Sequence, residues 1–170
     1  MRLANDALKL SIDIRDNLLV EMVRHGQNFY PNEYGGILVG RYVENNTVVR
    51  IEEIVLPISY KASAYSFERG TKGLRDALLK HFKSNPSLIY VGEWHTHPNG
   101  STMPSVTDTG ALNKIAQDES VFIENPVLVI VALNKLHQEF GFYVLYQDQV
   151  YSYVKEETQP KNSEEEDGTK

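Results

Sequence analysis

Two histidines separated by one residue, His95 and His97, have the spacing to bind a single metal ion. They end an apolar segment that favours a β-strand, where side chains two positions apart point to the same face. Imidazole nitrogens bind Zn²⁺ at roughly 2.0–2.1 Å, so the two rings would have to converge on one ion. Pairs of surface histidines are common on strands. The pair is therefore weak evidence for a metal site until a third ligand is found.

Asp108, eleven positions after His97, is the candidate third ligand. It opens residues 105–117, whose periodicity predicts a helix, and with Ser105 it forms a Ser-x-x-Asp pattern typical of a helix capping box. Asp108 is also in line with the apolar stripe of that helix, with no basic residue within one turn. Since a buried carboxylate needs a partner, we predict one Zn²⁺ per chain on His95, His97 and Asp108. Three protein ligands leave a position open for water, as in catalytic zinc sites.

A catalytic zinc site also needs a general base, because zinc lowers the pKa of its bound water to roughly 7 and a carboxylate must accept the proton. Two glutamates are candidates. Glu93 lies two residues before His95 and so shares its predicted strand face. Glu33 begins the segment Glu33-Tyr34-Gly35-Gly36-Ile37-Leu38-Val39-Gly40. Nothing in the local sequence decides between them.

The elements that must position these residues can be predicted from periodicity and turn residues. We expect an α/β (α+β) fold with a mixed sheet flanked by helices. Residues 59–71 have little periodicity and are predicted to form a loop. The predicted helices are 16–29, 73–83 and 105–117, and the predicted strands are 35–42, 47–56, 88–95, 127–133, 139–146 and 150–154.

Composition excludes several other functions. The 170 residues suit one domain, and with no cysteine a disulfide framework, a thiolate metal site and a cysteine nucleophile are impossible. We see no apolar run near the roughly 20 residues that span a bilayer and no signal peptide, so we expect a cytoplasmic protein without membrane contact.

Charge is concentrated at the end of the chain. Residues 156–170 hold six acids and two lysines, so they carry −4 of the net charge of −6. The remainder is nearly neutral, which does not favour nucleic-acid binding. The last residues contain no large apolar side chain. We therefore predict one domain over 1–155 and an acidic, disordered tail over 156–170.

Together these motifs resemble the JAB/MPN domain with a complete JAMM motif: the Glu33 segment, His95-Thr96-His97-Pro98 and Ser105-x-x-Asp108. Ser105 is the seventh residue after Pro98 rather than the eighth, but eleven residues separate the second histidine from the aspartate, as in eukaryotic deubiquitinases. The resemblance covers roughly residues 10–150. It implies an MPN/JAB-like (cytidine-deaminase-like) fold, zinc on the three ligands, Glu33 as the base and Ser105 as the donor to the oxyanion. If Ser105 also caps the helix, the two roles compete for its hydroxyl.

The sequence around the histidines is most similar to the short bacterial branch of this family. That branch includes deconjugating peptidases of anti-phage operons. The resemblance implies a zinc-dependent isopeptidase or peptidase that cleaves after the C-terminal glycine of a ubiquitin-like protein, with E1/E2-like partners. Phe67 and Arg69 would contact the extended tail of the substrate, bound as an added strand. Two alternatives stay open: a non-catalytic MPN scaffold, and a zinc hydrolase acting on a small molecule or a short peptide adduct. His25, His81 and His137 fit no ligand spacing.

Overall fold

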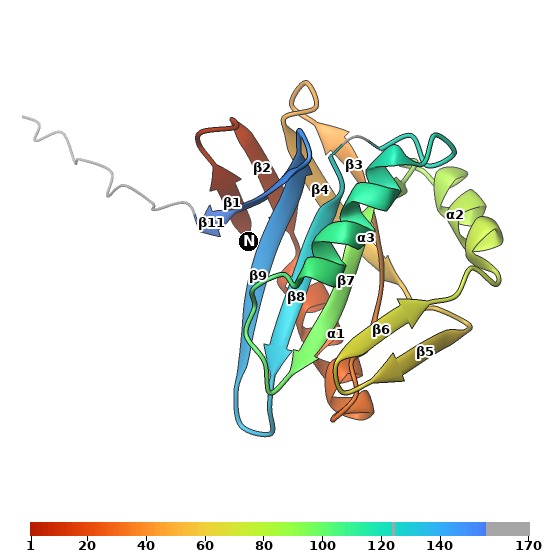
Figure 1. The fold of residues 1–170 in the computed structure, drawn as a ribbon. Helices are drawn as coiled ribbons and strands as arrows, with labels where there is room; N and C mark the ends of the chain where they lie inside the picture. The colour runs from red at the N-terminus through yellow and green to blue at the C-terminus, as the bar shows by residue number, and fades with distance from the viewer. Residues whose placement is uncertain (124, 156–170) are drawn as a thin grey trace, which may run out of the picture.

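Within the described residues the fold is built on one mixed sheet of nine strands (Figure 1). The structure, a computed structural model, describes residues 1–123 and 125–155. The strand order is β10-β9-β8-β7-β3-β4-β2-β1-β11, and the β7–β8 and β2–β4 pairs are parallel. The strands are β1 Arg2–Asn5, β2 Leu10–Ile14, β3 Gly35–Val43, β4 Val48–Val55, β7 Ile89–Pro98, β8 Val127–Leu133, β9 Gln138–Tyr146, β10 Gln149–Ser152 and β11 Val154–Lys155.

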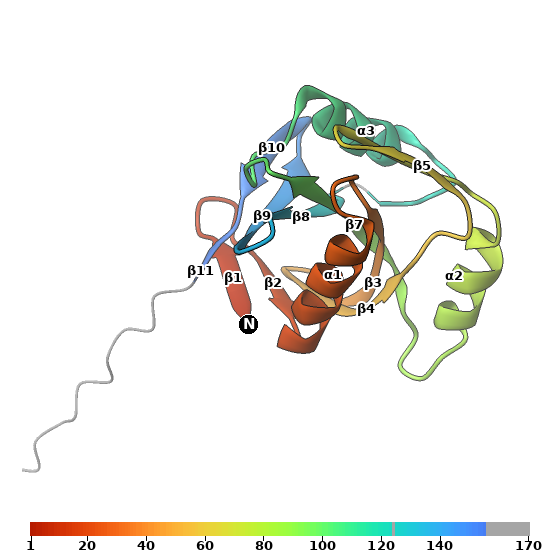
Figure 2. The ribbon, with the colours of Figure 1, turned by 90° about the horizontal axis from the view of Figure 1, so that it is seen from below.

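Three helices pack against this sheet, as the sequence predicts: α1 Asp16–Phe29, α2 Leu74–Phe82 and α3 Val106–Gln117. Figure 2 shows α1 on one face of the curved sheet and α3 on the other. Helix α1 buries Leu18, Met22 and Gly26. A side chain at Gly26 would collide with Leu133 and Thr96, so this glycine allows the helix to approach the sheet closely.

Alternation along β7 and β8 places apolar side chains in a different core on each face of the sheet. All seven residues of β8 are buried, since helices cover both faces. Trp94 of β7 is 1% exposed and belongs to the core under α1. Leu128 and Ile130 of β8 form a second core with Leu112 of α3. Because His95 pairs in register with Ile130, it faces the α3 side, as the strand alternation predicts.

The prediction of a loop for residues 59–71 was wrong. This segment forms a separate two-stranded hairpin, β5 Tyr60–Ser63 and β6 Ser66–Arg69, which stands beside the large sheet (Figure 1). All of β5 and half of β6 are exposed, so the alternation of apolar residues that would reveal a half-buried strand is weak. The contacts that hold the hairpin are tertiary, and one of them is between the rings of Phe67 and Tyr34, which lie 5.8 Å apart.

Strand β7 contains an irregularity next to Gly92, because Leu38 of β3 pairs with Gly92 but Val39 pairs with Tyr90. Gly92 has φ +156, and a Cβ there would overlap the carbonyl of Val127 on β8. Gly92→Ala is therefore expected to lower the free energy of unfolding by about 2–4 kcal/mol, through backbone strain and overpacking. Urea denaturation measures this, with Gly110→Ala in α3 as the matched control. No atom lies within 4 Å of a Cβ at Gly110, so the same change should stabilise that helix by roughly 0.5–1 kcal/mol. Equal stabilities of the two variants would contradict the prediction.

Two predictions concern the limits of the folded part. No helix within the described residues has both the length and the apolar character to cross a bilayer. The predicted tail, 156–170, lies outside the described residues, so its disorder and the domain limit at residue 155 stay predictions.

Candidate metal centre

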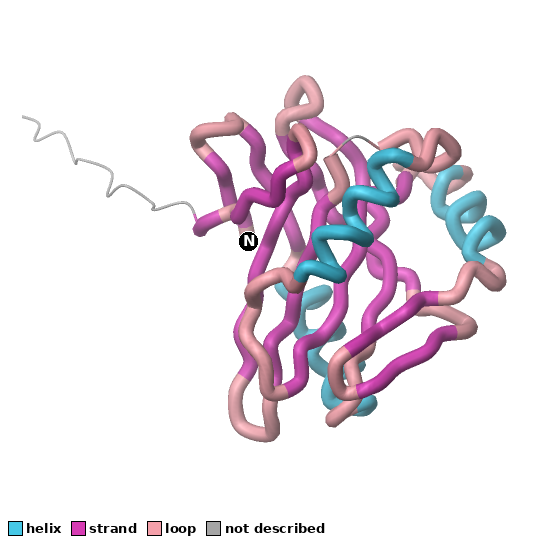
Figure 3. The backbone as a smooth tube through the Cα atoms, in the orientation of Figure 1, coloured by secondary structure: helices cyan, strands magenta, loops and turns pink. Residues whose placement is uncertain are grey.

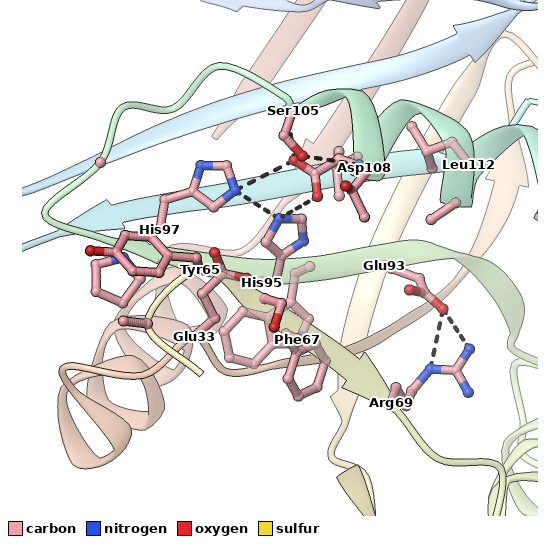
Figure 4. Close-up of a pocket in the computed structure, with 18 of the residues that line it drawn as sticks. Glu33, Tyr65, Phe67, Arg69, Glu93, His95, His97, Ser105, Asp108 and Leu112 are labelled. Atoms are coloured by element: carbon pink, nitrogen blue, oxygen red, sulfur yellow. Dashed lines mark hydrogen bonds and ion pairs between the residues drawn. The ribbon is translucent and has the colours of Figure 1, made fainter. Parts of the chain in front are cut away.

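The end of β7 and the first turn of α3 bring the three predicted ligands together (Figure 4). The Nε2 atoms of His95 and His97 lie 3.0 Å apart. Asp108 Oδ1 lies 3.2 Å from His95 Nε2, and Asp108 Oδ2 lies 3.5 Å from His97 Nε2. Ligand atoms bound tetrahedrally to zinc at roughly 2.0–2.1 Å are about 3.3 Å apart, so the observed spacing fits one such ion. Among the described residues, these three form the group of His, Asp and Glu side chains that could hold a metal.

The hydrogen bonding of His97 supports a cation at this point. Its Nδ1 lies 2.9 Å from the carbonyl oxygen of Ser101, which can only accept, so Nδ1 carries the proton. In the neutral ring Nε2 then presents a lone pair, and its neighbours are His95 Nε2 at 3.0 Å and the acceptor oxygens of Asp108. A bound cation, or an added proton, satisfies both acceptors. A backbone carbonyl that orients the remaining ring nitrogen is also typical of histidine ligands in metal sites.

Hydrogen bonds and a nearby charge favour the anionic form of Asp108 despite its burial. Burial alone raises a carboxyl pKa, but hydrogen bonds with His95 and His97, the charge of His95 and the backbone N–H of Ser105 together hold the pKa of Asp108 well below its usual range. The side chains of the three residues are only 11–14% exposed. Asp108 is thus ionised at neutral pH and mostly withdrawn from water, which strengthens its attraction for a cation.

Ser105 and Asp108 also form the capping box that the sequence predicts. The Asp108 N–H donates to Ser105 Oγ at 3.1 Å, and the Ser105 N–H donates to Asp108 Oδ2 at 2.6 Å. In this cap the Ser105 hydroxyl is an acceptor only, so its own proton can be donated elsewhere. The cap uses a lone pair of the Ser105 oxygen and donation would use its proton, so the cap leaves the donor available; the role of Ser105 as a donor to an oxyanion stays a prediction.

Glu33 lies immediately before β3 at the same site, and Figure 4 shows its carboxylate directed toward the two imidazoles. Its backbone N–H donates to the Ser63 carbonyl at 2.7 Å, so the β5–β6 hairpin holds its position. Burial raises the pKa of Glu33, and the charge of Asp108 adds to this, while His95 and His97 act in the opposite direction. A carboxyl group with a raised pKa beside a metal group is suited to accept and return a proton.

Glu93, the other candidate for the general base, is instead bonded to a side chain of the hairpin. Arg69 of the hairpin bonds to Glu93 Oε1 through Nη2 at 2.5 Å and through Nε at 3.2 Å (Figure 4). Both side chains are about four-fifths buried, with 17% and 23% exposed. Arg69, expected from the sequence to contact substrate, thus ties the hairpin to β7.

A single cleft connects these groups. It has a volume of about 630 Å³ and runs between the β5–β6 hairpin and α3, over β7. The five motif residues line it, and so do both Phe67 and the Arg69–Glu93 pair; the opposite wall is formed by Ala111, Leu112 and Ile115. The other histidines lie elsewhere: His25 pairs with Glu21, His81 with Glu53 and His137 with Glu139. The Ser101 carbonyl was missed by sequence reasoning, since a backbone atom leaves no signal in residue types.

Metal binding at this centre is expected to weaken as the pH falls. Burial lowers the pKa of His97, but its hydrogen bonds to Asp108 and Ser101 and the charges of Asp108 and Glu33 raise it above the ordinary value. Metal must displace that proton below this pKa, so the apparent association constant should fall about tenfold per pH unit for each proton released. Titration with Zn²⁺ in a competing chelator between pH 5.5 and 8 measures the slope. An affinity independent of pH across that range would contradict the prediction.

The fold and the site define an α+β protein with a His-His-Asp group, able to hold a metal, in an open cleft. The family model for prokaryotic homologues of the JAB domain matches residues 15–145. The chain therefore belongs to this family. The solution structure of a protein from Desulfitobacterium hafniense has the same fold, with a TM-score of 0.62 at 20% identity, covering 83% of this chain and 88% of that one.

Three curated proteins are similar in sequence. A CD-NTase/cGAS isopeptidase of Enterobacter hormaechei subsp. hoffmannii is 36% identical over 122 residues, which cover 71% of this chain and 67% of that protein. A protein of the same name from Pseudomonas aeruginosa is 34% identical over 110 residues, with 63% and 67% covered. A probable metalloprotease of Sinorhizobium fredii is 24% identical over 120 residues, with 69% and 73% covered. Family membership and these names support a peptidase activity and a metal.

Proposed function

We propose that this chain is a zinc-dependent isopeptidase that cleaves after the C-terminal glycine of a ubiquitin-like protein or its conjugate. The observation that carries the proposal is that the His95–His97–Asp108 group, the Glu33 carboxylate and the Ser105 hydroxyl line one cleft. Similarity to two proteins named CD-NTase/cGAS isopeptidase supports a CD-NTase/cGAS-type protein as the conjugated partner.

Each of the five motif residues has a defined role in the proposed reaction. His95 Nε2, His97 Nε2 and one oxygen of Asp108 would hold the zinc, which when bound supplies a Lewis acid and lowers the pKa of a coordinated water. Glu33 would accept a proton at its carboxylate from the attacking water and pass it to the leaving amine. The Ser105 Oγ–H, free of the helix cap, would donate to the oxyanion that develops on the scissile carbonyl.

The shape of the cleft suits an extended chain ending in glycines. Ser66, Phe67 and Arg69 of β6 line it, and among the described residues only β5 pairs with β6, so the other edge of β6 is open to an added strand. A peptide bound along that edge would be held through its backbone. The α3 wall lies across the cleft from β6, and a glycine tail presents no side chain to obstruct entry.

The test is cleavage of defined conjugates by zinc-loaded protein. Ubiquitin-like proteins that end in Gly-Gly, joined to a lysine ε-amine or fused to a reporter, are compared with a matched set ending in Ala-Ala and with Gly-Gly-aminomethylcoumarin. Cleavage of the Gly-Gly protein substrates alone is the expected result. Efficient cleavage of the small amide instead would favour a small-molecule hydrolase. Stoichiometric zinc without cleavage of any substrate would favour a scaffold.

Ser105→Ala is expected to lower kcat by roughly 10²–10³-fold, because it removes an oxyanion donor. The same change removes the acceptor of the helix cap and should lower the free energy of unfolding by about 1 kcal/mol. Steady-state kinetics and urea denaturation measure the two effects separately. Ser105→Thr is the control, since it keeps the hydroxyl and the cap. If Ser105→Ala lost stability but kept kcat, Ser105 would be a cap and nothing more.

A further inference from the structure

The two halves of the proposed metal site are joined by residues 99–104, the loop that leads from β7 into α3 (Figure 3). Within it, the Ser101 carbonyl accepts from His97 Nδ1 at 2.9 Å. The next carbonyl along the chain, that of Thr102, accepts from the Tyr143 hydroxyl at 2.9 Å. The two carbonyls belong to consecutive peptide units joined at the Thr102 Cα, so anchoring the Thr102 carbonyl limits the movement of the Ser101 carbonyl.

Tyr143 is buried and closely packed, so it can hold the loop in place at Thr102. It lies on β9, its side chain is 8% exposed, and it belongs to the core between the sheet and α3. Gly141, two positions earlier, provides the space for this contact. A Cβ at Gly141 would come within 2.7 Å of the Tyr143 ring and 2.9 Å of Thr102 Cβ, so both atoms would have to move. The Tyr143–Thr102 contact is therefore closely packed as well as hydrogen-bonded.

The loop has a second attachment, but it lies on the other side of Ser101. Asn99 donates its N–H to the Leu133 carbonyl at 2.8 Å, and Tyr30 donates its hydroxyl to Asn99 Oδ1 at 2.9 Å. These bonds fix the start of the loop just after β7. Of the two tyrosine hydroxyls, only that of Tyr143 acts on the residue adjacent to Ser101.

We propose that Tyr143 is a positioning residue for the metal site. By holding Thr102, it keeps the Ser101 carbonyl against His97 Nδ1, which fixes the tautomer and the orientation in which Nε2 faces His95 and Asp108. Its hydroxyl touches neither the ligand atoms nor the substrate cleft. The inference rests on the proposed metal site, because positioning His97 matters only if His97 is a ligand.

The experiment uses the full chain loaded with Co²⁺, whose visible absorption bands report the geometry of its ligands. Tyr143→Phe retains the ring and removes the hydroxyl. Loss of a partner outside the ligand set typically weakens metal binding by 10–100-fold, so a Co²⁺ dissociation constant raised about tenfold and a changed Co²⁺ spectrum are expected. Tyr151→Phe removes a hydrogen bond of the same length, 2.9 Å to Gln149 Oε1, on the neighbouring strand β10, and should alter neither.

Tyr30→Phe is the stricter control, because it removes an attachment of the same loop at Asn99 rather than beside Ser101. Its effect on the Co²⁺ dissociation constant and spectrum is expected to be smaller than that of Tyr143→Phe. Equal effects would show that general loop rigidity is responsible and would overturn the inference. A Tyr143→Phe protein with a lower unfolding midpoint but the parent spectrum and affinity would overturn it as well. If the parent chain itself failed to bind Co²⁺ or Zn²⁺, the metal site would be wrong, which is a distinguishable outcome.

Discussion

Glu33→Gln is expected to abolish cleavage while leaving the metal bound. Loss of a general base typically lowers the rate by roughly 10²–10⁴-fold, and Glu33 is not among the three residues whose ligand atoms converge. The variant should show this loss in kcat, with a metal content equal to that of the parent by elemental analysis. A variant that is fully loaded with metal but inactive would show that Glu33 is needed for proton transfer and not for metal binding.

Stability provides a second check on the same variant. Because burial raises the pKa of Glu33 on folding, ionising this carboxylate costs more in the folded metal-free protein than in the unfolded chain, and its contribution to stability falls as the pH rises through the folded-state pKa. Neutral glutamine removes this unfavourable charge. The free energy of unfolding of metal-free Glu33→Gln at pH 7–8 should therefore equal or exceed that of the parent.

Glu93→Gln is the informative comparison, since sequence reasoning alone left both carboxylates open. Glu93 is bonded to Arg69, so its replacement should weaken the attachment of the hairpin and reduce activity far less than Glu33→Gln. If Glu93→Gln were instead the inactive variant and Glu33→Gln remained active, the two roles would have to be exchanged.

Asp108→Asn is expected to weaken metal binding by more than the roughly 10–100-fold typical of outer partners, because it removes the only anionic ligand. Asparagine has the same shape and its carbonyl oxygen can still accept from the Ser105 N–H, so the helix cap is retained. The loss should appear in the zinc dissociation constant and, at limiting metal, in cleavage.

The same variant should lose stabilisation by metal. A ligand at 1,000 times its dissociation constant stabilises the folded state by about 4 kcal/mol, so zinc should raise the unfolding midpoint of the parent and raise that of Asp108→Asn much less. Asp118→Asn, at the exposed C-terminal cap of the same helix, is the matched control and should respond to zinc like the parent. Equal midpoint shifts for all three proteins would contradict Asp108 as a ligand.

Residue types and local periodicity were sufficient to predict several features of the site. His95 and His97 share a face because β-strand side chains alternate, and both are found on the α3 side of β7. The apolar stripe and capping pattern predicted the helix that carries Asp108. These predictions succeeded because each depends on interactions between residues fewer than about five positions apart.

The amino-acid sequence by itself determined which side chains could bind a metal and on which elements they lie. Only the tertiary structure decided that Glu33 lies beside the imidazoles, through the pairing of β3 with β7, and that Glu93 is bonded to Arg69, through packing of the separate hairpin against β7. It also decided that residues 60–69 form a hairpin and that the backbone carbonyl of Ser101 orients His97. The physical reason is that exposed strands and backbone acceptors carry no residue-type pattern, so contacts between distant segments fix them.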